Sequence, residues 1–183
     1  VCVGEIPPAF TNIASATGLG TISYEWQSRT YGTAFGNVTA SATTQVYTPT
    51  TAINTTTFFR RAAISSYGGA QCEEYSNIIQ IGISSPPITG LQAQGGAITA
   101  QDTVTLCTGE SITFNATGGG VEFLFYLDDN PLGVKSGSSI LTTSTLITGS
   151  RIKVESFNAQ GCSSFSPEIE VQIVDNPVIS LTS

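Results

Sequence analysis

The sequence predicts an all-β protein built from two tandem β-sandwich domains, and three observations support this fold class. Apolar and polar residues alternate, as in Ile79-Gln80-Ile81 and Ile169-Glu170-Val171, which is the period of half-buried strands. Clusters of Gly, Asn, Asp and Pro separate such stretches at short intervals. The block around Cys72 recurs around Cys162, 90 positions later, so one module is present twice.

Residues 1–85 form the first expected domain. Its strands are predicted near 8–15, 21–28, 44–48, 56–65 and 77–83. Trp26 occupies an inward position of an alternating strand, where a sandwich core takes a large side chain. Little chain precedes Cys2, so we expect the first strand of this domain to be missing or supplied from elsewhere.

Residues 86–176 form the second expected domain. Its strands are predicted near 98–106, 111–116, 121–128, 132–135, 140–147, 151–158 and 168–174. About seven short strands with regular turns are typical of an immunoglobulin-like sandwich, and Phe123 and Phe125 are available in place of Trp26. The prolines at Pro86-Pro87 indicate a semi-rigid connection. Residues 177–183 match the opening of the second domain, so they are expected to start a next module or a linker.

The repeat runs without a gap in sequence. Paired positions include Ala62 with Ile152, Ile64 with Val154 and Tyr67 with Phe157. Tyr67 is therefore expected to share a packing role with Phe157. A second match pairs Cys2-Val3-Gly4-Glu5 with Cys107-Thr108-Gly109-Glu110.

The four cysteines fall two in each domain and allow three pairings. We predict Cys2–Cys72 and Cys107–Cys162, because equivalent modules should close equivalent loops. Each bond would stabilise its domain by about 4 kcal/mol, and disulfides indicate an oxidising compartment. The second cysteine of each domain is placed in a glycine-containing loop. Four reduced thiols are the alternative, and a zinc site is disfavoured because neither a CxxC pair nor a histidine is present.

Composition excludes several function classes. The chain has 6 Lys and Arg residues and a net charge of −7, so it offers no basic surface for nucleic acid or an anionic membrane. No apolar run is long enough for a transmembrane helix. Without histidine the usual nucleophilic triads are absent, and the carboxylate pairs Asp128-Asp129 and Glu73-Glu74 point apart. We expect no enzyme activity, cofactor or metal.

Two further clusters each allow a binding role and a structural one. Asp128, Asp129 and Asn130 could offer oxygens to calcium, but Asp-Asn-Pro is ordinary hairpin-turn chemistry, which we favour. Four aromatic residues could form a stacking platform for a glycan, or pack in the core, which is the commoner outcome. These four are Tyr31, Phe35, Tyr47 and Tyr67.

Several segments carry a resemblance to a known family. They are 20–28, 46–49, 57–61 and 72–77 in the first domain, and 125–128 and 158–163 in the second. They resemble Ig-like (PKD-like) repeats of the large cell-surface adhesins of gliding Bacteroidetes, including SprB-type adhesins. The resemblance implies type IX secretion, an extracellular or cell-surface location, and a role in adhesion, gliding motility or a stalk. It also makes Asp102-Thr103-Val104 a candidate O-glycosylation motif, with Thr103 as the acceptor.

The leading functional hypothesis is therefore structural: two disulfide-stapled modules of an adhesin stalk, whose partners are neighbouring modules of the same protein. A second hypothesis is a binding module, in which residues 28–42, longer than their counterpart in domain 2, present a loop surface to a glycan or a surface protein. A third is a filament subunit, in which residues 177–183 donate a strand to the next chain.

Overall fold

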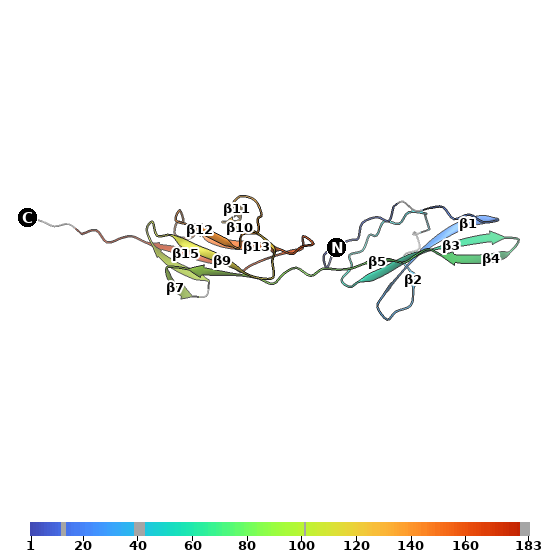
Figure 1. Ribbon diagram of the computed structural model, residues 1–183, viewed down its shortest axis with the longest axis horizontal. Coiled ribbons are helices and arrows are strands. Elements are labelled where there is room, and N and C mark those ends of the chain that lie inside the picture. Colours follow the sequence, from blue (N-terminus) through green and yellow to red (C-terminus); the bar gives the residue numbers. More distant parts are fainter. Residues whose placement is uncertain (12–13, 39–42, 101, 180–183) are drawn as a thin grey trace, which may run out of the picture. The chain divides into compact units, whose positions relative to one another are not determined.

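The computed structural model describes residues 1–11, 14–38, 43–100 and 102–179. It divides into two compact units, Val1–Ser85 (unit 1) and Pro86–Ser183 (unit 2) (Figure 1). The described residues form strands, turns and irregular segments, and no helix occurs among them. The protein is therefore all-β, as the alternation of apolar residues predicts.

Unit 1 contains one regular sheet. Its strands are β1 (Thr21–Thr30), β2 (Gly36–Asn37), β3 (Thr57–Tyr67), β4 (Ala70–Tyr75) and β5 (Ile79–Ile81). They follow the order β2-β1-β3-β4, and β5 also pairs with β3. The long antiparallel pairing of β1 with β3, from Thr21↔Ser66 to Thr30↔Thr57, forms the centre of the unit.

The opposite layer of unit 1 is irregular. It is tied to the rest by isolated bridges between Phe10 and Tyr47, Glu5 and Ile53, and Cys2 and Ser84. The strands predicted at 8–15 and 44–48 are thus reduced to single bridged residues, with 12–13 lying outside the described part. A proline supplies no backbone N–H to a ladder. Pro8 begins the first of these segments, and Pro7 and Pro49 lie beside them.

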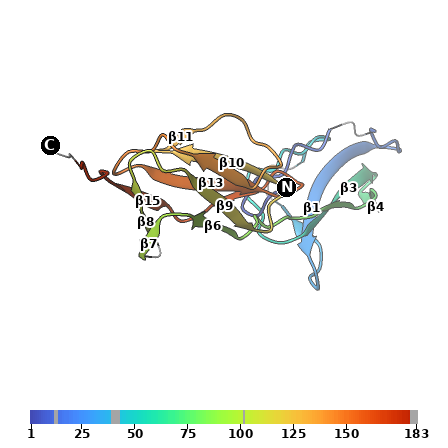
Figure 2. The same cartoon turned by 60° about the vertical axis from the view of Figure 1, so that its left-hand side comes forward.

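Unit 2 has two sheets. Its strands are β6 (Thr89–Gln94), β7 (Ala97–Ala100), β8 (Thr103–Cys107), β9 (Ile112–Gly118), β10 (Glu122–Leu127), β11 (Asn130–Pro131), β12 (Ile140–Thr143), β13 (Arg151–Phe157), β14 (Ser163–Phe165) and β15 (Ile169–Val174). One sheet has the order β11-β10-β13-β15-β8-β7, with β14 on β13; the other has the order β12-β9-β6 (Figure 2). The two sheets enclose one core, so unit 2 is a β-sandwich.

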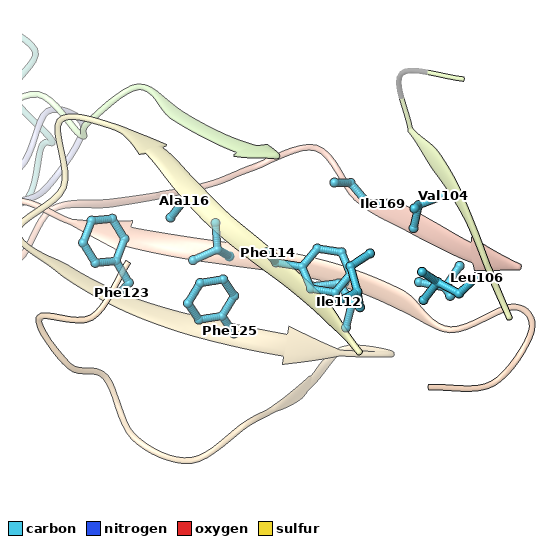
Figure 3. Packing of buried hydrophobic residues seen from close by; sticks show 11 residues of the cluster. Val104, Leu106, Ile112, Phe114, Ala116, Phe123, Phe125 and Ile169 are labelled. Carbon is cyan, nitrogen blue, oxygen red and sulfur yellow. The ribbon is translucent and has the colours of Figure 1, made fainter. Parts of the chain in front are cut away.

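The core of unit 2 takes side chains from both sheets. Phe123 and Phe125 of β10 face β9, with Phe123 near Ala116 and Phe125 near Phe114 (Figure 3). The cluster as a whole comprises Val104, Leu106, Ile112, Phe114, Ala116, Phe123, Phe125, Ile152, Val154, Ile169 and Val171. The core of unit 1 is smaller and aromatic: Phe10, Trp26 and Phe59 are buried, and Tyr47 packs against them. The predicted burial of Trp26 is confirmed, since it is 2% exposed.

The strand predicted at 132–135 is wrong. Leu132 and Val134 alternate in sequence but are both exposed, and Gly133 between them has a φ of +92°, outside the range of strand residues. The strand that follows β10 in the chain and pairs with its outer edge is instead the short β11. Strands β2, β4, β6 and β14 were not predicted; they are short or rich in Gly, Ala and polar residues, which are depleted in strands.

The sequence repeat contains a gap that only the structure reveals. The Ser76 N–H donates to the Arg61 carbonyl in unit 1, and the Ser166 N–H donates to the Val154 carbonyl in unit 2, both at 2.9 Å. The serines are 90 positions apart, but the acceptors are 93 apart (154 − 61 = 93). Unit 2 therefore has three fewer residues than unit 1 between these two positions (166 − 154 = 12, against 76 − 61 = 15).

This shift overturns the expected pairing of Tyr67 with Phe157. Hairpin β3–β4 turns tightly through Gly68 and Gly69, both with positive φ, as a two-residue I′ turn requires. Tyr67 lies beside this turn and is 65% exposed. The equivalent of Phe157 is instead Ile64 (157 − 93 = 64).

Candidate functional sites

Each unit has a Cys-x-Gly-Glu turn of the same geometry. In unit 1 the Glu5 side chain accepts the Cys2 N–H at 2.7 Å, and the Glu5 N–H donates to the Cys2 carbonyl at 3.1 Å. In unit 2 the Glu110 side chain accepts the Cys107 N–H at 3.0 Å, and the Glu110 N–H donates to the Cys107 carbonyl at 3.0 Å. The glycine of each turn has a φ near +80°, which glycine adopts without strain. The sequence match between the two turns is therefore a structural match.

Both turns lie beside the end of the last strand of their unit. Cys2 forms a parallel bridge with Ser84, and Cys107 pairs in parallel with Val174. We call this the exit end of each unit, because the last strand finishes there. Cys2 and Cys107 are the exit-end cysteines.

The other two cysteines lie at the opposite end of each unit, on the hairpin. Cys72 pairs with Ser65 across hairpin β3–β4, and the Cys162 carbonyl accepts the Asn158 N–H at 2.9 Å beside hairpin β13–β14. These are equivalent places, since 65 and 158 differ by the 93 positions found above. Cys162 lies in a loop as predicted, but Cys72 lies in strand β4, because the tight glycine turn lets that strand begin earlier. We call them the hairpin-end cysteines.

The predicted pairs Cys2–Cys72 and Cys107–Cys162 are wrong. Cys72 and Cys107 are free and exposed thiols, whereas Cys2 and Cys162 are disulfide-bonded. The reason is distance within each unit. From Cys162 to the level of Cys107, β14 and β15 carry the chain from Ser163 to Val174, which at about 3.3 Å per residue is roughly 30 Å or more. Disulfides need Cα atoms within about 7 Å of each other.

The exit end of unit 2 is closed by a parallel ladder between β8 and β15, from Glu170↔Thr103 to Val174↔Cys107. The Glu170 N–H donates to the Asp102 carbonyl at 2.7 Å, and the Thr108 N–H donates to the Val174 carbonyl at 3.0 Å. We call this pairing the terminal-strand ladder. In unit 1 the Cys2↔Ser84 bridge takes the same place.

Unit 2 begins at its hairpin end. The Ser164 and Thr89 hydroxyls are hydrogen-bonded at 2.7 Å, and Thr89 pairs with Gly118 at the start of β6. The chain therefore enters unit 2 at one end of the sandwich and leaves it from β15 at the other.

The sheet of unit 1 carries an arginine–aromatic surface, formed by Arg29, Phe35, Phe58, Arg60 and Tyr75. Arg29 lies over Phe35 and Phe58, 5.0 and 4.9 Å from the ring centroids. Arg60 lies over Phe35 and Tyr75, at 4.1 and 3.6 Å. Such cation–π contacts contribute about 0.5–1 kcal/mol each at exposed sites.

Alternation along the strands explains this surface. Trp26 of β1 and Phe59 of β3 point into the core, so their neighbours Gln27, Phe58 and Arg60 face the other way. The Arg60 Nε–H donates to the Gln27 side-chain oxygen at 2.8 Å. The sequence already contained this signal: Arg and Phe recur on the face opposite the core residues.

The four aromatic residues considered for a stacking platform do not come together on one surface. Tyr47 packs in the core, with its ring stacked on Trp26 at a centroid distance of 5.6 Å, and burial raises the pKa of its hydroxyl. Tyr31 is 77% exposed and contacts Phe58 edge-to-face at 5.2 Å. Phe35 joins the arginines, and Tyr67 lies apart at the hairpin tip. Of the candidate binding stretch 28–42, residues 39–42 lie outside the described residues.

The Asp128-Asp129 segment is a hairpin turn, as we favoured. Both residues have positive φ, and they connect the paired residues Leu127 and Asn130, which defines a type I′ turn. Their carboxylates are occupied: Asp128 accepts the Arg151 N–H at 2.8 Å, and Asp129 forms an ion pair with Lys153. Hydrogen bonding to Lys153 lowers the pKa of Asp129. No group of three potential metal ligands occurs among the described residues.

Thr103 is the first residue of β8 and is half-buried. Together with Asp102, Arg151, Glu168 and Glu170 it lines a cavity of about 220 Å³. Its glycosylation stays a prediction. Of the candidate donor strand 177–183, residues 180–183 lie outside the described part, and 177–179 form no strand. Within the described chain, no helix has the length and apolar character needed to cross a membrane.

Comparison with protein families gives one match, which covers part of the chain. Residues 1–85 are similar to a family described as a domain of unknown function (DUF8696). This segment is less than half of the 183-residue chain. No curated protein matches the chain.

Solved structures that resemble the chain are Ig-like or fibronectin III-like modules. The N-terminal four Ig domains of Dscam1 isoform 6.9 are 13% identical, with 92% of this chain covered and a TM-score of 0.37; the chain spans only 42% of that structure. Fibronectin(III)-like modules of Clostridium thermocellum CbhA are 16% identical, with 94% and 91% of the two chains covered and a TM-score of 0.40. The amphioxus IgVJ-C2 molecule is 9% identical, with 92% and 98% covered and a TM-score of 0.35. TM-scores of this size do not bear on function.

Proposed function

We propose that the chain is a structural, load-bearing piece of an extracellular repeat protein, and that each unit is an Ig-like module. The observation that carries this proposal is the terminal-strand ladder of unit 2. The bonded state of Cys2 and Cys162 supports an oxidising, extracellular location.

The ladder suits a module that is pulled from its two ends. The chain enters unit 2 at the hairpin end through β6, which pairs with β9, and leaves from β15 at the exit end. Once tension has drawn β6 from β9 and β7 from β8, it loads β8 and β15 along their axes in opposite directions. In this shear geometry the evenly spaced bonds of a parallel ladder share the load and must break together. Strands that are peeled apart from one end lose their bonds one at a time and offer less resistance.

A proline in β15 tests this role. In a parallel ladder alternate residues bond the neighbouring strand; Glu170 does so, and Gln172 is the next in this series, with an exposed side chain. Gln172→Pro removes one N–H from the ladder, while Gln172→Ala keeps it and serves as the matched control. In single-molecule stretching we expect the unfolding force of unit 2 to fall in Gln172→Pro alone. Equal forces in the two variants would contradict a load-bearing ladder.

The finer assignment is also a proposal: the parent is a large bacterial surface adhesin of the gliding Bacteroidetes kind, exported by type IX secretion, with neighbouring modules of the same protein as partners. The residues that resemble those repeats support it, as does the recurrence of the Cys-x-Gly-Glu turn in both units. The sequence that flanks this chain in its gene tests it: further copies of the module and a terminal sorting domain are expected.

A second candidate function is glycan binding by unit 1, favoured by the arginine–aromatic surface. Exposed Tyr31 contacts Phe58 there, and half-buried Phe35 lies beneath two guanidinium groups, which suits the ring faces and carboxylates of an acidic glycan. On an array of acidic glycans, we expect binding that is lost in Tyr31→Ala and kept in Tyr67→Ala, an exposed tyrosine outside this surface. An array without signal for the unaltered chain would exclude this function.

A further inference from the structure

The chain contains two kinds of cysteine, and each kind occurs once in each unit. The exit-end cysteines are Cys2 and Cys107, held in Cys-x-Gly-Glu turns. The hairpin-end cysteines are Cys72 and Cys162, on the strand that follows the hairpin turn or just before it. Because the two kinds lie at opposite ends of a sheet, a bond between them within one unit is sterically excluded.

One cysteine of each kind is disulfide-bonded, and one of each kind is a free thiol. Cys2 and Cys162 are disulfide-bonded, and they are one of each kind. Cys72 and Cys107 are free and exposed, and they are also one of each kind. The free thiols therefore belong to the same two structural positions that take part in disulfide bonding elsewhere in the chain.

We propose that Cys107 of one copy of this chain forms a disulfide with Cys72 of a second copy. The exit end of unit 2 would thereby be joined to the hairpin end of unit 1 in the next molecule. Such a head-to-tail bond uses two different surfaces, so it can repeat and build a covalent chain of copies. This inference concerns covalent assembly and does not depend on the load-bearing role proposed above.

Local structure fits both partners for this bond. Cys107 is the last residue of β8 and opens an exposed turn whose backbone is fixed by Glu110 and Gly109, so its thiol is presented at a defined place. Cys72 lies on the wall of a cavity of about 380 Å³, which has room beside the thiol for the tip of such a turn. Both thiols have carboxylates nearby, Glu110 on one side and Glu73 and Glu74 on the other. Salt should therefore speed the reaction by screening their repulsion.

The reaction is a thiol–disulfide exchange with a glutathione-type disulfide as the oxidant. The thiolate of one cysteine attacks glutathione disulfide, which forms a mixed disulfide and releases one glutathione thiolate. The thiolate of the second cysteine then attacks the protein sulfur of that mixed disulfide and releases a second glutathione thiolate. Two protein thiols are oxidised, one glutathione disulfide is reduced to two glutathiones, and the two thiol protons end on these products.

Two single variants make the pairing measurable. Cys72→Ser keeps Cys107 as its free thiol, and Cys107→Ser keeps Cys72. Each variant, and an equimolar mixture of isotopically light and heavy forms, is incubated with oxidised and reduced glutathione at moderate salt. Non-reducing gels and peptide mass spectrometry then quantify the dimers. Circular dichroism verifies that each variant is folded, which is expected because both side chains are exposed.

We expect the mixed dimer, linked through Cys107 and Cys72, to exceed either homodimer at least tenfold, where random collision would give about twofold. The unaltered chain should give a ladder of dimers and higher species that collapses on reduction. A mixed dimer at the random ratio, glutathione adducts alone, or two thiols that stay free would each overturn the proposal.

Discussion

The two units differ in how they cover their hydrophobic cores. Unit 2 encloses eleven buried residues between two regular sheets. Unit 1 has one regular sheet, and an irregular layer covers an aromatic core of three buried residues. The comparison teaches that this module does not need its second sheet to be regular, provided that large side chains and polar anchors replace the missing strand pairs.

Equivalent positions show how the replacement works. Trp26 pairs with Arg61 in unit 1, as Phe125 pairs with Val154 in unit 2. The larger indole fills more of the core, and its Nε1–H donates to the Thr44 carbonyl in the irregular layer at 3.1 Å. An aromatic residue that also offers a polar group can thus hold a segment that lacks a ladder.

Arg61 supplies a second anchor where unit 2 has a valine. Its side chain is buried and donates to the Ala14 carbonyl at 2.7 Å and the Gln45 carbonyl at 3.3 Å. It also lies over the Tyr24 ring, 4.4 Å from the centroid. The buried guanidinium is satisfied by carbonyls of two segments that lie outside the named strands, so the charge and the irregular layer stabilise each other.

The largest effect that would sharpen the comparison is expected from Trp26→Ala. Loss of a buried Trp or Phe side chain costs about 3–5 kcal/mol, and a unit of this size is stabilised by only roughly 4–13 kcal/mol. Trp26→Ala should therefore strongly lower or abolish the calorimetric transition of unit 1 and leave that of unit 2 unchanged.

The matched variant is Phe125→Ala in unit 2. It should lower the other transition and leave the fluorescence of Trp26, the sole tryptophan of the chain, unchanged. If either substitution moved both transitions together, the units would not be independent and the comparison would fail.

An intermediate effect is expected from Arg61→Leu. The substitution removes two hydrogen bonds from a charged donor, each worth about 1.5–3 kcal/mol, and leaves two carbonyls without that donor. We expect unit 1 to lose roughly 2–4 kcal/mol in urea unfolding followed by Trp26 fluorescence.

Arg60→Leu is the control, because Arg60 faces outward and bonds the Gln27 side chain rather than the irregular layer. It should cost about 1–2 kcal/mol through the loss of its two cation–π contacts, less than Arg61→Leu. Equal losses in the two variants would show that Arg61 does not anchor this layer.

Much of the structure of both units could be predicted from the sequence. Alternation predicted β1, β3, β9, β10, β13 and β15, because long strands with one buried face leave a clear period. It also predicted the burial of Trp26, and turn chemistry predicted the role of Asp128-Asp129. The irregular layer of unit 1 could not be predicted in this way. A Thr- and Pro-rich segment with scattered apolar residues has no period that distinguishes an isolated β-bridge from a strand.

The cysteine pairing failed for a different reason. The 90-position repeat made Cys72 and Cys162 equivalent, and the second match made Cys2 and Cys107 equivalent. Both equivalences are correct, but equivalence says nothing about distance. Only the strand directions place the two cysteines of a unit at opposite ends. The three-residue difference between the hairpins was also hidden, because a tight glycine turn and a longer loop leave the flanking apolar residues nearly in phase.

The smallest effect concerns charge. In unit 2 Lys153 lies between Asp129 and Glu168, whereas unit 1 has no lysine. Hydrogen bonding to Lys153 lowers the pKa of Asp129. The Asp129 contribution is therefore complete above its ordinary pKa of 3.8 and is lost as pH falls through the lowered value. Hydrogen bonding to Asp129 raises the pKa of Lys153 above 10.5, so that contribution is lost only as pH rises through the raised value.

Lys153→Gln should consequently flatten the acid limb of the urea midpoint of unit 2 and leave that of unit 1 unchanged. Arg151→Gln is the control, because its contact with Glu168 is long, at 3.9 Å, and exposed. The effect is small because these groups are solvated. An acid limb that persisted in Lys153→Gln would mean that other carboxylates set it, and charge would then not distinguish the two units.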